Sequence, residues 1–516
     1  MAQLMTVLLA LHLMQVIIDG AYKAPREVNF WFGLILLILV LALSLTGYLL
    51  PWDQKGYWAT KVTTNIAGIT PVIGPMLQKL MVGGSDYGHH TLSRFFALHA
   101  GVLPGMIVVL LVGHIALFRK HGITAKKPYR KPDAKFWPDQ VLMDGVACLS
   151  VLATVLFFIV APRLSNPSAA LGAELGAPAD PSEAFSAARP EWYFLFLFQF
   201  LKYFPGETEI WGAIVVPNLV LGLIFLMPFF GKWKLGHRFN IGFVCALLAG
   251  AGLLTYLAIA QDKADPNYQL AVKQSQAVAQ RAKELARKGI PQTGALGMVR
   301  SDPYLQGPVL FSKHCASCHR YGGHDGLGFV SSEPQSASDL KGFGSREWLS
   351  GLLDPAEVDS TNYYGGTKFK EGKMVRFVKR DIAKFSAGEK VDLQKIIVAL
   401  SAEAGLPKQE SLDENDRERV EEGKKLMGSE MMRCTECHQF GKADEDATAP
   451  DLTGYGSKAW LISFLNDPAH DRFYGKRNDR MPSYGKENIL EESSIGILAD
   501  WLREDWIETD QVSIKH

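Results

Sequence analysis

The chain has 516 residues, a formal net charge of +1 and 48% hydrophobic residues. This length predicts three or four domains, and the balanced charge gives no support for a nucleic-acid partner. The average composition hides a division, because residues 1–260 are strongly apolar and residues 261–516 are polar.

The first half contains apolar stretches long enough to cross a bilayer, for which a helix needs about 20 residues. They lie at 30–50, 95–118, 140–161, 212–230 and 239–260. Residues 4–18 form a further apolar run that looks like the end of a spanning helix. The sequence therefore predicts a transmembrane bundle of α-helices.

Basic residues in two loops orient these helices. The loop after residue 118 has one acid, Asp133, among the basic residues Arg119, Lys120, Lys126, Lys127, Arg130, Lys131 and Lys135. The loop before residue 239 carries Lys232, Lys234 and Arg238. Loops rich in Lys and Arg face the cytoplasm, so the last helix is predicted to end on the outer side.

Three histidines lie within apolar helices, where such residues are costly and commonly functional. His12 lies in the first run, and His99 and His114 lie fifteen residues apart in one helix. That spacing separates them by roughly 22 Å on broadly one face, which suits two haems stacked across a ~30 Å hydrocarbon core. Histidines that bond only to neighbouring helices are the alternative interpretation.

Two glycines in the preceding helix fit the same picture. Gly33 and Gly47 lie fourteen residues apart. A missing side chain lets a flat porphyrin approach the backbone, although glycine also serves simple packing between membrane helices.

The second half contains two copies of the pattern Cys-x-x-Cys-His, which attaches c-type haem. In each copy the two cysteines form thioethers to the porphyrin and the histidine takes an axial position on the iron. The residues are Cys315, Cys318, His319, Cys434, Cys437 and His438. Chance is the alternative, but two copies in a chain of six cysteines make it remote. Haem of this type is attached outside the cytoplasmic membrane, in agreement with the loop charges.

An internal repeat accompanies these motifs. Residues 339–349 match residues 451–461, and each copy follows a haem motif and precedes a methionine, Met374 or Met481. This order resembles class I cytochrome c, whose sixth ligand is a methionine. Met481 precedes a proline, as is usual there, whereas a purely structural role is the alternative for Met374. We expect a helical linker over 263–306 and two small helical cytochrome c domains over 307–404 and 405–516.

Four segments of the membrane half carry a second resemblance. They are residues 47–52 (GYLLPW), 57–62 (YWATKV), 91–99 (TLSRFFALH) and 190–193 (PEWY). They resemble the cytochrome b subunit of cytochrome bc complexes, over about residues 1–260. The histidine spacing, Ala59 and the three helices that follow the histidine bundle resemble the b6 type with a fused subunit IV. This divides the half into a haem-binding part, 1–125, and a subunit IV-like part, 126–262.

The resemblance implies roles for individual residues. His12 and His114 would bind the inner b haem and His99 the outer one, with Arg94 also at the cofactor. The family's partner for His99 belongs before Met1, so either a separate polypeptide supplies it with the missing first helix or the chain start is truncated. Glu191 would accept a proton from quinol beside Tyr193; an interfacial carboxylate without that role is the alternative.

Together these features predict the fused cytochrome b–dihaem cytochrome c subunit of a bacterial quinol:cytochrome c oxidoreductase. It would oxidise quinol at the outer face, pass electrons through the b haems and the c haems, and translocate protons. Its cofactors would be two b haems, two covalent c haems and quinone. It would lie in the cytoplasmic membrane with the cytochrome c domains on the periplasmic side. The implied partners are a second copy in a homodimer, a cytochrome c or terminal oxidase, and a separate Rieske iron–sulfur subunit, since no spare cysteine pair could hold that cluster.

Two other functions are weighed against this one. The first is a membrane electron-transfer anchor of another dehydrogenase or reductase, which predicts no Pro-Glu-Trp-Tyr element. The second is a tethered electron wire, which predicts no histidines within the membrane helices.

Overall fold

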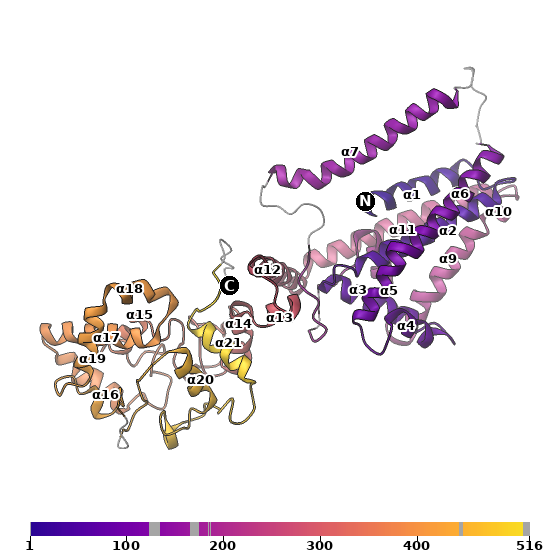
Figure 1. Cartoon of the computed structure of the whole chain (residues 1–516). Helices are drawn as coiled ribbons and strands as arrows, with labels where there is room; N and C mark the ends of the chain where they lie inside the picture. The colour runs from indigo at the N-terminus through magenta and orange to yellow at the C-terminus, as the bar shows by residue number, and fades with distance from the viewer. Residues whose placement is uncertain are drawn as a thin grey trace. The chain divides into compact units, whose positions relative to one another are not determined.

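The computed structural model describes residues 2–122, 135–165, 175–183, 185, 187–442 and 447–508. The chain divides into two compact units, Met1–Gln280 and Arg281–His516, called here the membrane unit and the soluble unit. The described residues form helices joined by loops, with isolated bridges in place of strands (Figure 1). The predicted all-α fold class is confirmed. Most of the predicted basic loop, including Lys126, Lys127, Arg130, Lys131 and Asp133, lies outside the described residues.

The membrane unit is built from long apolar helices. Five helices in the described ranges have the length and composition to cross a membrane: Glu27–Tyr48, His89–His121, Phe136–Leu164, Gly206–Phe225 and Gly236–Ala264. They match the five predicted stretches, and the chain is an integral membrane protein. The shorter α1 (Ala2–Ile18) accounts for the first apolar run.

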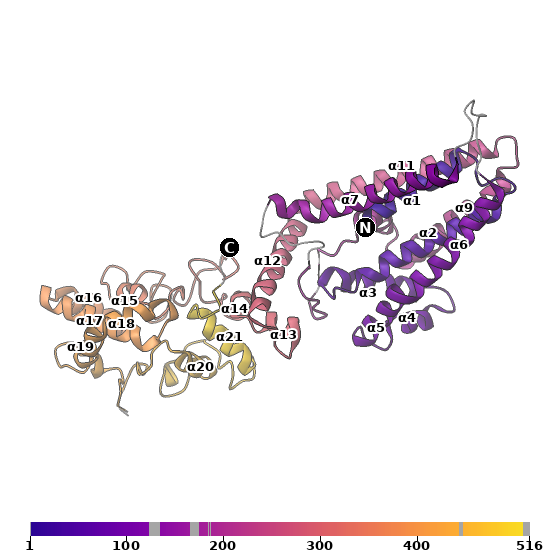
Figure 2. The same cartoon turned by 45° about the horizontal axis from the view of Figure 1, so that its top comes forward.

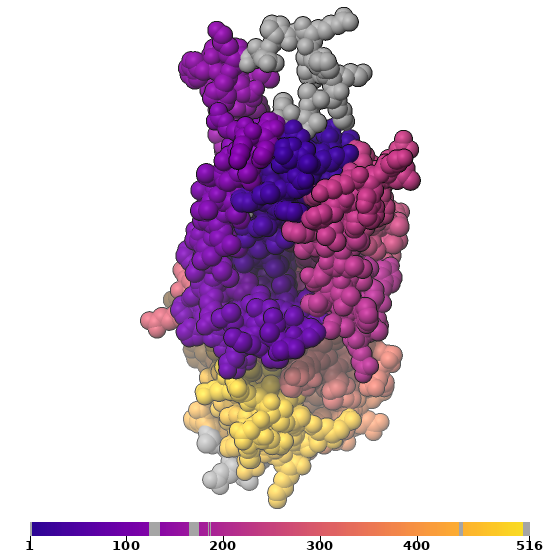
Figure 3. All heavy atoms as spheres, turned by 90° about the vertical axis from the view of Figure 1, so that its right-hand side faces the viewer, coloured from indigo at the N-terminus to yellow at the C-terminus, as the bar shows by residue number. Residues whose placement is uncertain are grey.

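The helix α2 (Glu27–Tyr48) lies in the middle of this unit. It runs beside α6 (Leu103–His121) and also contacts the end of α9 (Val216–Phe225) (Figures 1 and 2). Trp31 of α2 stacks on Phe225 at 5.1 Å, and its indole donates to the Phe225 carbonyl. In Figure 3 the indigo residues near the N-terminus accordingly lie between purple and pink segments.

Much of the apolar surface of the spanning helices faces outward. Val109 of α6 is 71% exposed and Phe158 of α7 (Val141–Ser165) is 70% exposed. A soluble protein would bury such side chains, whereas hydrocarbon tails accept them and leave only the backbone to be satisfied within each helix.

A sharp corner follows α2 and is held by a distant loop. The Asp53 side chain accepts from Gly56 N at 2.8 Å and so caps α3 (Gln54–Gly68), satisfying one orphan donor of its first turn. Gln54 N donates to Ala177 O, and Ala179 N donates to Trp52 O. Residues 177–179, from which the chain continues toward residue 190, are therefore attached at the end of α2.

The helix α12 (Pro266–Lys288) leads into the soluble unit. Arg281 near its end binds Asp302 through two charge-assisted bonds, of 2.8 and 2.9 Å, and both side chains are almost fully buried. The stretch expected as a helical linker also contains α13 (Gly294–Arg300) and the start of α14 (Pro303–His314).

The rest of the soluble unit contains the helices of the two repeats. They are α15 (Arg346–Leu352), α16 (Lys373–Arg380), α17 (Ala387–Ala404), α18 (Glu410–Asn415), α19 (Arg417–Met427), α20 (Lys458–Asn466) and α21 (Glu492–Leu502). One hydrophobic core joins residues of both repeats, from Phe311 to Leu502.

The repeat seen in the sequence recurs in the local structure. Ser345 and Ser457 accept from Trp348 N and Trp460 N and cap α15 and α20. Each of these tryptophans then donates its indole N–H to the backbone carbonyl of the aspartate that begins its matched segment (339–349 or 451–461), at 3.1 and 2.9 Å. The two segments thus fold alike down to single hydrogen bonds.

Candidate cofactor sites

The two histidines of the long His89–His121 helix point at α2. His99 Nδ1 lies 3.0 Å from the carbonyl of Leu43, and His114 Nδ1 lies 3.1 Å from the carbonyl of Asn29. A carbonyl can only accept, so the proton of each ring must be on Nδ1. The lone pair of Nε2 is then free to bind a metal.

The predicted glycines lie directly under these rings. A Cβ atom added to Gly47 would lie 2.5 Å from His99 Cε1, and one added to Gly33 would lie 3.3 Å from His114 Cε1. Both glycines therefore leave a cradle that a side chain would fill. In this structure both glycines make room for the histidine rings, whereas the sequence predicted that they make room for the porphyrin itself.

A wide helical turn contains His99. Residues Leu98–Val102 form a π-helical turn, η1, just before Pro104. Such a turn takes up one extra residue, so the fifteen residues from His99 to His114 complete close to four turns of about 3.6 residues. The two rings therefore meet the same helix, α2, as the spacing predicted.

The other predicted residues of this region are placed as follows. His12, on α1, is exposed but close enough to His114 for the two to interact electrostatically. Arg94 is exposed and donates to the carbonyl of Leu80, near the end of α4 (Gly74–Val82). Arg94 is thus anchored to protein backbone one helical turn before His99.

The histidines of the two motifs in the soluble unit make the same hydrogen bond from Nδ1 to a backbone carbonyl. His319 Nδ1 lies 2.8 Å from the carbonyl of Ser338, and His438 Nδ1 lies 2.7 Å from that of Pro450. Burial lowers the pKa of both histidines, which favours the neutral ring that a metal requires. All four rings therefore present a free Nε2.

One cavity of about 590 Å³ is lined by Cys315, Cys318 and His319 of the first motif and by His438 of the second. Its lining includes the predicted methionines Met374 and Met481 and a set of aromatic residues: Phe343, Trp348, Tyr364, Tyr455, Trp460 and Tyr474. Burial raises the pKa of Cys315 to about 12 and that of Cys434 to about 11, so these thiols stay neutral. The cavity combines soft sulfur and imidazole donors with flat apolar walls.

The donor set fits haem better than a bare metal ion. Within the described ranges no three His, Cys, Asp or Glu side chains are grouped to hold a metal. Haem needs only one or two axial donors from the protein, because the macrocycle supplies the rest.

The Pro-Glu-Trp-Tyr segment meets the same end of α2 as His99. Tyr193 is within hydrogen-bonding reach of Ser44, and Tyr48 donates to the carbonyl of Arg189 at 3.3 Å. Glu191 is half-buried just before the short helix η3 (Trp192–Phe194). Because His99 rests on Leu43 and Gly47 of this helix, the predicted proton acceptor and the predicted outer ligand share one scaffold.

An ion pair not predicted from the sequence holds this segment. Arg189 binds both carboxylate oxygens of Asp262 at 2.9 to 3.1 Å, and its guanidinium lies 4.3 Å from the Tyr268 ring. Asp262 is near the end of α11 (Gly236–Ala264). The partners are 73 residues apart, so no local pattern could have paired them.

Two family models and several relatives match the membrane half. Residues 3–173 match the family described as cytochrome b (N-terminal)/b6/petB, and residues 178–277 match cytochrome b (C-terminal)/b6/petD. The chain is 32% identical to the cytochrome bc complex cytochrome b subunit of Chlorobaculum thiosulfatiphilum (45% of this chain, 53% of the relative). It is 33% identical to cytochrome b of Rhodobacter capsulatus, covering 42% and 50%.

Two further matches are shorter or looser. Cytochrome b6 of Synechococcus elongatus is 42% identical over 24% of this chain and 57% of that protein. A solved structure titled hyperthermophilic respiratory Complex III is 28% identical, with a TM-score of 0.41, over 54% of this chain and 73% of that one. The chain spans about half the length of the curated relatives that it matches.

Proposed function

We propose that this chain, whose membrane half carries the N-terminal and C-terminal domains of cytochrome b, is the cytochrome b–cytochrome c subunit of a quinol:cytochrome c oxidoreductase. The observation that carries the proposal is the shared histidine device. Four histidine rings, two in the membrane unit and two in the soluble unit, each donate from Nδ1 to a backbone carbonyl and leave Nε2 free for a metal. One polypeptide would thus offer imidazole ligands to haems in both of its units.

The residues divide the work of holding the cofactors. His12, His99 and His114 would hold b haems, with Gly33 and Gly47 admitting the rings. In the soluble unit His319 and His438 would give the fifth ligands, and Met374 and Met481 the sixth. When bound, the haem irons supply one-electron relay sites. The cysteines of the two motifs would fix the soluble pair covalently.

Quinol oxidation releases two electrons and two protons and leaves quinone. Glu191 is the residue that we assign to accept a proton, and Tyr193 borders the same site. Both lie at the end of α2 that also carries the contacts of His99. One electron would pass to the separate Rieske acceptor and then to the c haems, and the other would pass through the b haems to quinone at the inner face. Both protons would be released on the outer side, the first by way of Glu191.

Partners follow from what the chain lacks. Of its six cysteines four are in the haem motifs, and Cys148 and Cys245 are in different membrane helices. A Rieske cluster needs two cysteines and two histidines at one site, so we assign it to a separate subunit. A cytochrome c or terminal oxidase would take the electrons, and the complex would be a homodimer with the soluble unit on the periplasmic face.

Replacement of the proton acceptor tests the proposal. In membranes that hold the assembled complex, Glu191→Gln should lower quinol-driven electron transfer about 100-fold, the lower end for loss of a general base. The b and c haem spectra should stay unchanged, because the amide is nearly isosteric. Glu207→Gln, an exposed glutamate after α8 (Leu195–Leu201), is the matched control. Full turnover in Glu191→Gln would contradict the assigned role.

A further inference from the structure

Two equivalent loops of the soluble unit cross each other. They are residues 341–345 and 453–457, called here the crossing loops, and each joins the two halves of its repeat. A Cβ atom added to Gly456 would lie 3.7 Å from the Cα of Gly344, and the rings of Phe343 and Tyr455 lie 5.2 Å apart. Gly344 is equivalent to Gly456 and Phe343 to Tyr455. Contacts between equivalent residues mark an approximate twofold axis through the crossing.

Each repeat consists of a leading half and a trailing half. The leading halves, 303–340 and 417–452, contain the haem motifs. The trailing halves, 346–404 and 458–502, contain the methionines. The two halves of one repeat stay joined beside the crossing loop, where Asp339 N donates to Asn362 O at 3.0 Å.

The first leading half packs against the second trailing half. Trp501 of α21 stacks on Tyr321 at 4.3 Å and lies 5.2 Å from Phe311 of α14. Gly307 makes room for this tryptophan, since an added Cβ would lie 2.2 Å from its ring. In the part of the chain that the structure describes, α14 thus has its extensive contact with the last helix, α21, and not with α17 of its own repeat.

The methionine segment of the second repeat covers the first haem motif. Tyr484, three residues after Met481, donates to the carbonyl of His314 at 2.6 Å. Its hydroxyl is also within hydrogen-bonding reach of the Cys315 thiol. The segment that contains Met481 is therefore held against the first motif, and Met481 and Cys315 line the same cavity although 166 residues separate them in the chain.

The reciprocal contact joins the second leading half to the first trailing half. Gly423 of α19 packs on α17, where an added Cβ would lie 2.7 Å from Ala399 Cβ. Lys424 pairs with Glu403 at 3.3 Å across the same two helices. Arg433, next to Cys434, interacts electrostatically with Asp381, just after the helix α16 that contains Met374.

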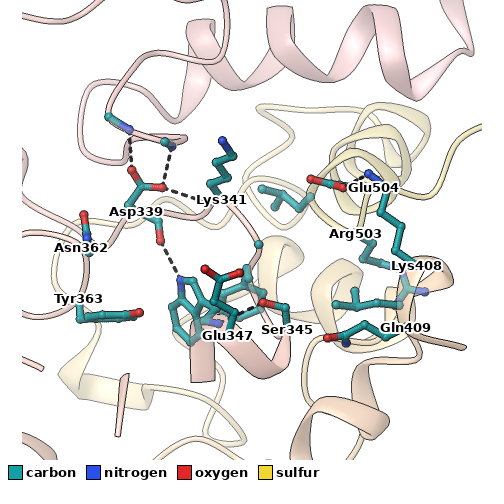
Figure 4. A pocket seen from close by; sticks show the side chains of 17 residues that line it. Asp339, Lys341, Ser345, Glu347, Asn362, Tyr363, Lys408, Gln409, Arg503 and Glu504 are labelled. Atoms are coloured by element: carbon teal, nitrogen blue, oxygen red, sulfur yellow. Dashed lines mark hydrogen bonds and ion pairs between the residues drawn. The ribbon is translucent and has the colours of Figure 1, made fainter. Parts of the chain in front are cut away.

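Buried polar contacts hold the exchanged arrangement. Arg503, after α21, donates to the carbonyls of Ala404, Gly405 and Gly456 and is 9% exposed. Figure 4 shows Arg503 and Glu504 beside Lys408 and Gln409, which follow α17. The ends of the two trailing halves thus meet at the crossing.

We propose that the two repeats exchange their sixth ligands. Met481 serves the haem at Cys315–His319, and Met374 serves the haem at Cys434–His438. Sequence order alone pairs each motif with the next methionine, whereas the contacts pair it with the methionine of the other repeat. This inference rests on the proposed haem attachment at both motifs. Residues 345–456, which hold the first trailing half and the second leading half, then form one complete site. This continuous segment is inserted between the two halves that form the other site.

The test removes one haem at a time from the full-length chain in its membrane complex. With Cys434→Ala and Cys437→Ala, only the first of the two covalent c haems remains, together with the b haems. In this protein Met481→Ala should abolish the near-infrared magnetic circular dichroism band of methionine–histidine ligation, and Met374→Ala should leave it. The b haems have no methionine ligand and do not contribute to this band. Met431→Ala, at an exposed methionine, is the matched control.

The reciprocal background covers the case in which one variant fails to assemble. With Cys315→Ala and Cys318→Ala, Met374→Ala should abolish the band and Met481→Ala should leave it. Loss of the band with the methionine of the same repeat, in either background, overturns the exchange while leaving the proposed function intact. Wild-type chain without covalent haem overturns both.

Discussion

The histidines of both units make the same kind of hydrogen bond to a backbone carbonyl, but the accepting carbonyl is much farther away along the sequence in the membrane unit than in the soluble unit. In the membrane unit the carbonyls are on another helix, 56 residues before His99 and 85 residues before His114. In the soluble unit they are in the loop that follows, 19 residues after His319 and 12 after His438. In the soluble unit a histidine ring is thus oriented within one loop, whereas in the membrane unit its orientation depends on two packed helices.

The largest expected difference is between covalent and non-covalent cofactors. Cys315→Ala with Cys318→Ala should remove one of two covalent haems and leave the b-type spectrum unchanged, because the thioether bonds are lost. His114→Leu should do the reverse, removing one b-type component and leaving the covalent pair. Haem-stained denaturing gels and the pyridine haemochrome spectrum measure both quantities. An unchanged covalent haem content in the cysteine variant would refute the motif assignment.

A smaller difference is expected between the two glycines of α2. Gly47→Ala places a Cβ 2.5 Å from the His99 ring, which cannot be accommodated without moving the ring or the helix. Gly33→Ala places it 3.3 Å from His114, which a shift of a few tenths of an ångström relieves. The first variant should lose the b-type component that depends on His99, and the second should keep both. Low-temperature spectra resolve the components; equal behaviour of the variants would contradict this steric account.

The sequence predicts what depends on local pattern. The five spanning helices follow from length and hydropathy, and the repeat follows from matching residues 339–349 with 451–461. The Nδ1 contacts of His99 and His114 required the packing of η1 and α6 on α2, which no short pattern specifies. Two other contacts could not be predicted from the sequence for the same reason, because each joins residues far apart in the chain. They are the ion pair of Arg189 with Asp262 and the packing of α14 on α21.

The Arg189–Asp262 ion pair should stabilise the segment that contains Glu191. Its side chains are 19% and 14% exposed, so Asp262→Ala takes the carboxylate from a largely covered guanidinium, at a cost of about 1 to 3 kcal/mol. Hydrogen exchange at residues 190–195 should quicken, while exchange in the soluble unit should not change. Glu209→Ala, at an exposed acid, is the control. Unaltered exchange at 190–195 would argue that the pair does not hold this segment.

The smallest expected effect is at a helix cap of the soluble unit. Ser386 and Glu389 form a capping box at the start of α17, and the hydrogen bond from Ser386 lowers the pKa of the Glu389 carboxyl. Because the pKa of this carboxyl is lower in the folded chain than in the unfolded chain, its hydrogen bond stabilises the fold at pH values above the unfolded pKa. That stability is lost as pH falls through the lowered pKa. Ser386→Ala should cost about 1 kcal/mol and should reduce this acid dependence. Amide exchange of Gly388 and Glu389 against pH measures it; an unchanged profile would contradict the role of the cap.

The central claim is that one polypeptide joins quinol oxidation in the membrane to covalently bound haems outside it. Its most direct test is the reduction of the c haems by added quinol, followed spectrally in membranes that hold the assembled complex. We expect rapid reduction of the c haems in the wild type and strongly slowed reduction in Glu191→Gln, with equal haem content in both. If the covalent haems stay oxidised under quinol while a chemical reductant reduces them fully, the two halves do not form one electron-transfer chain.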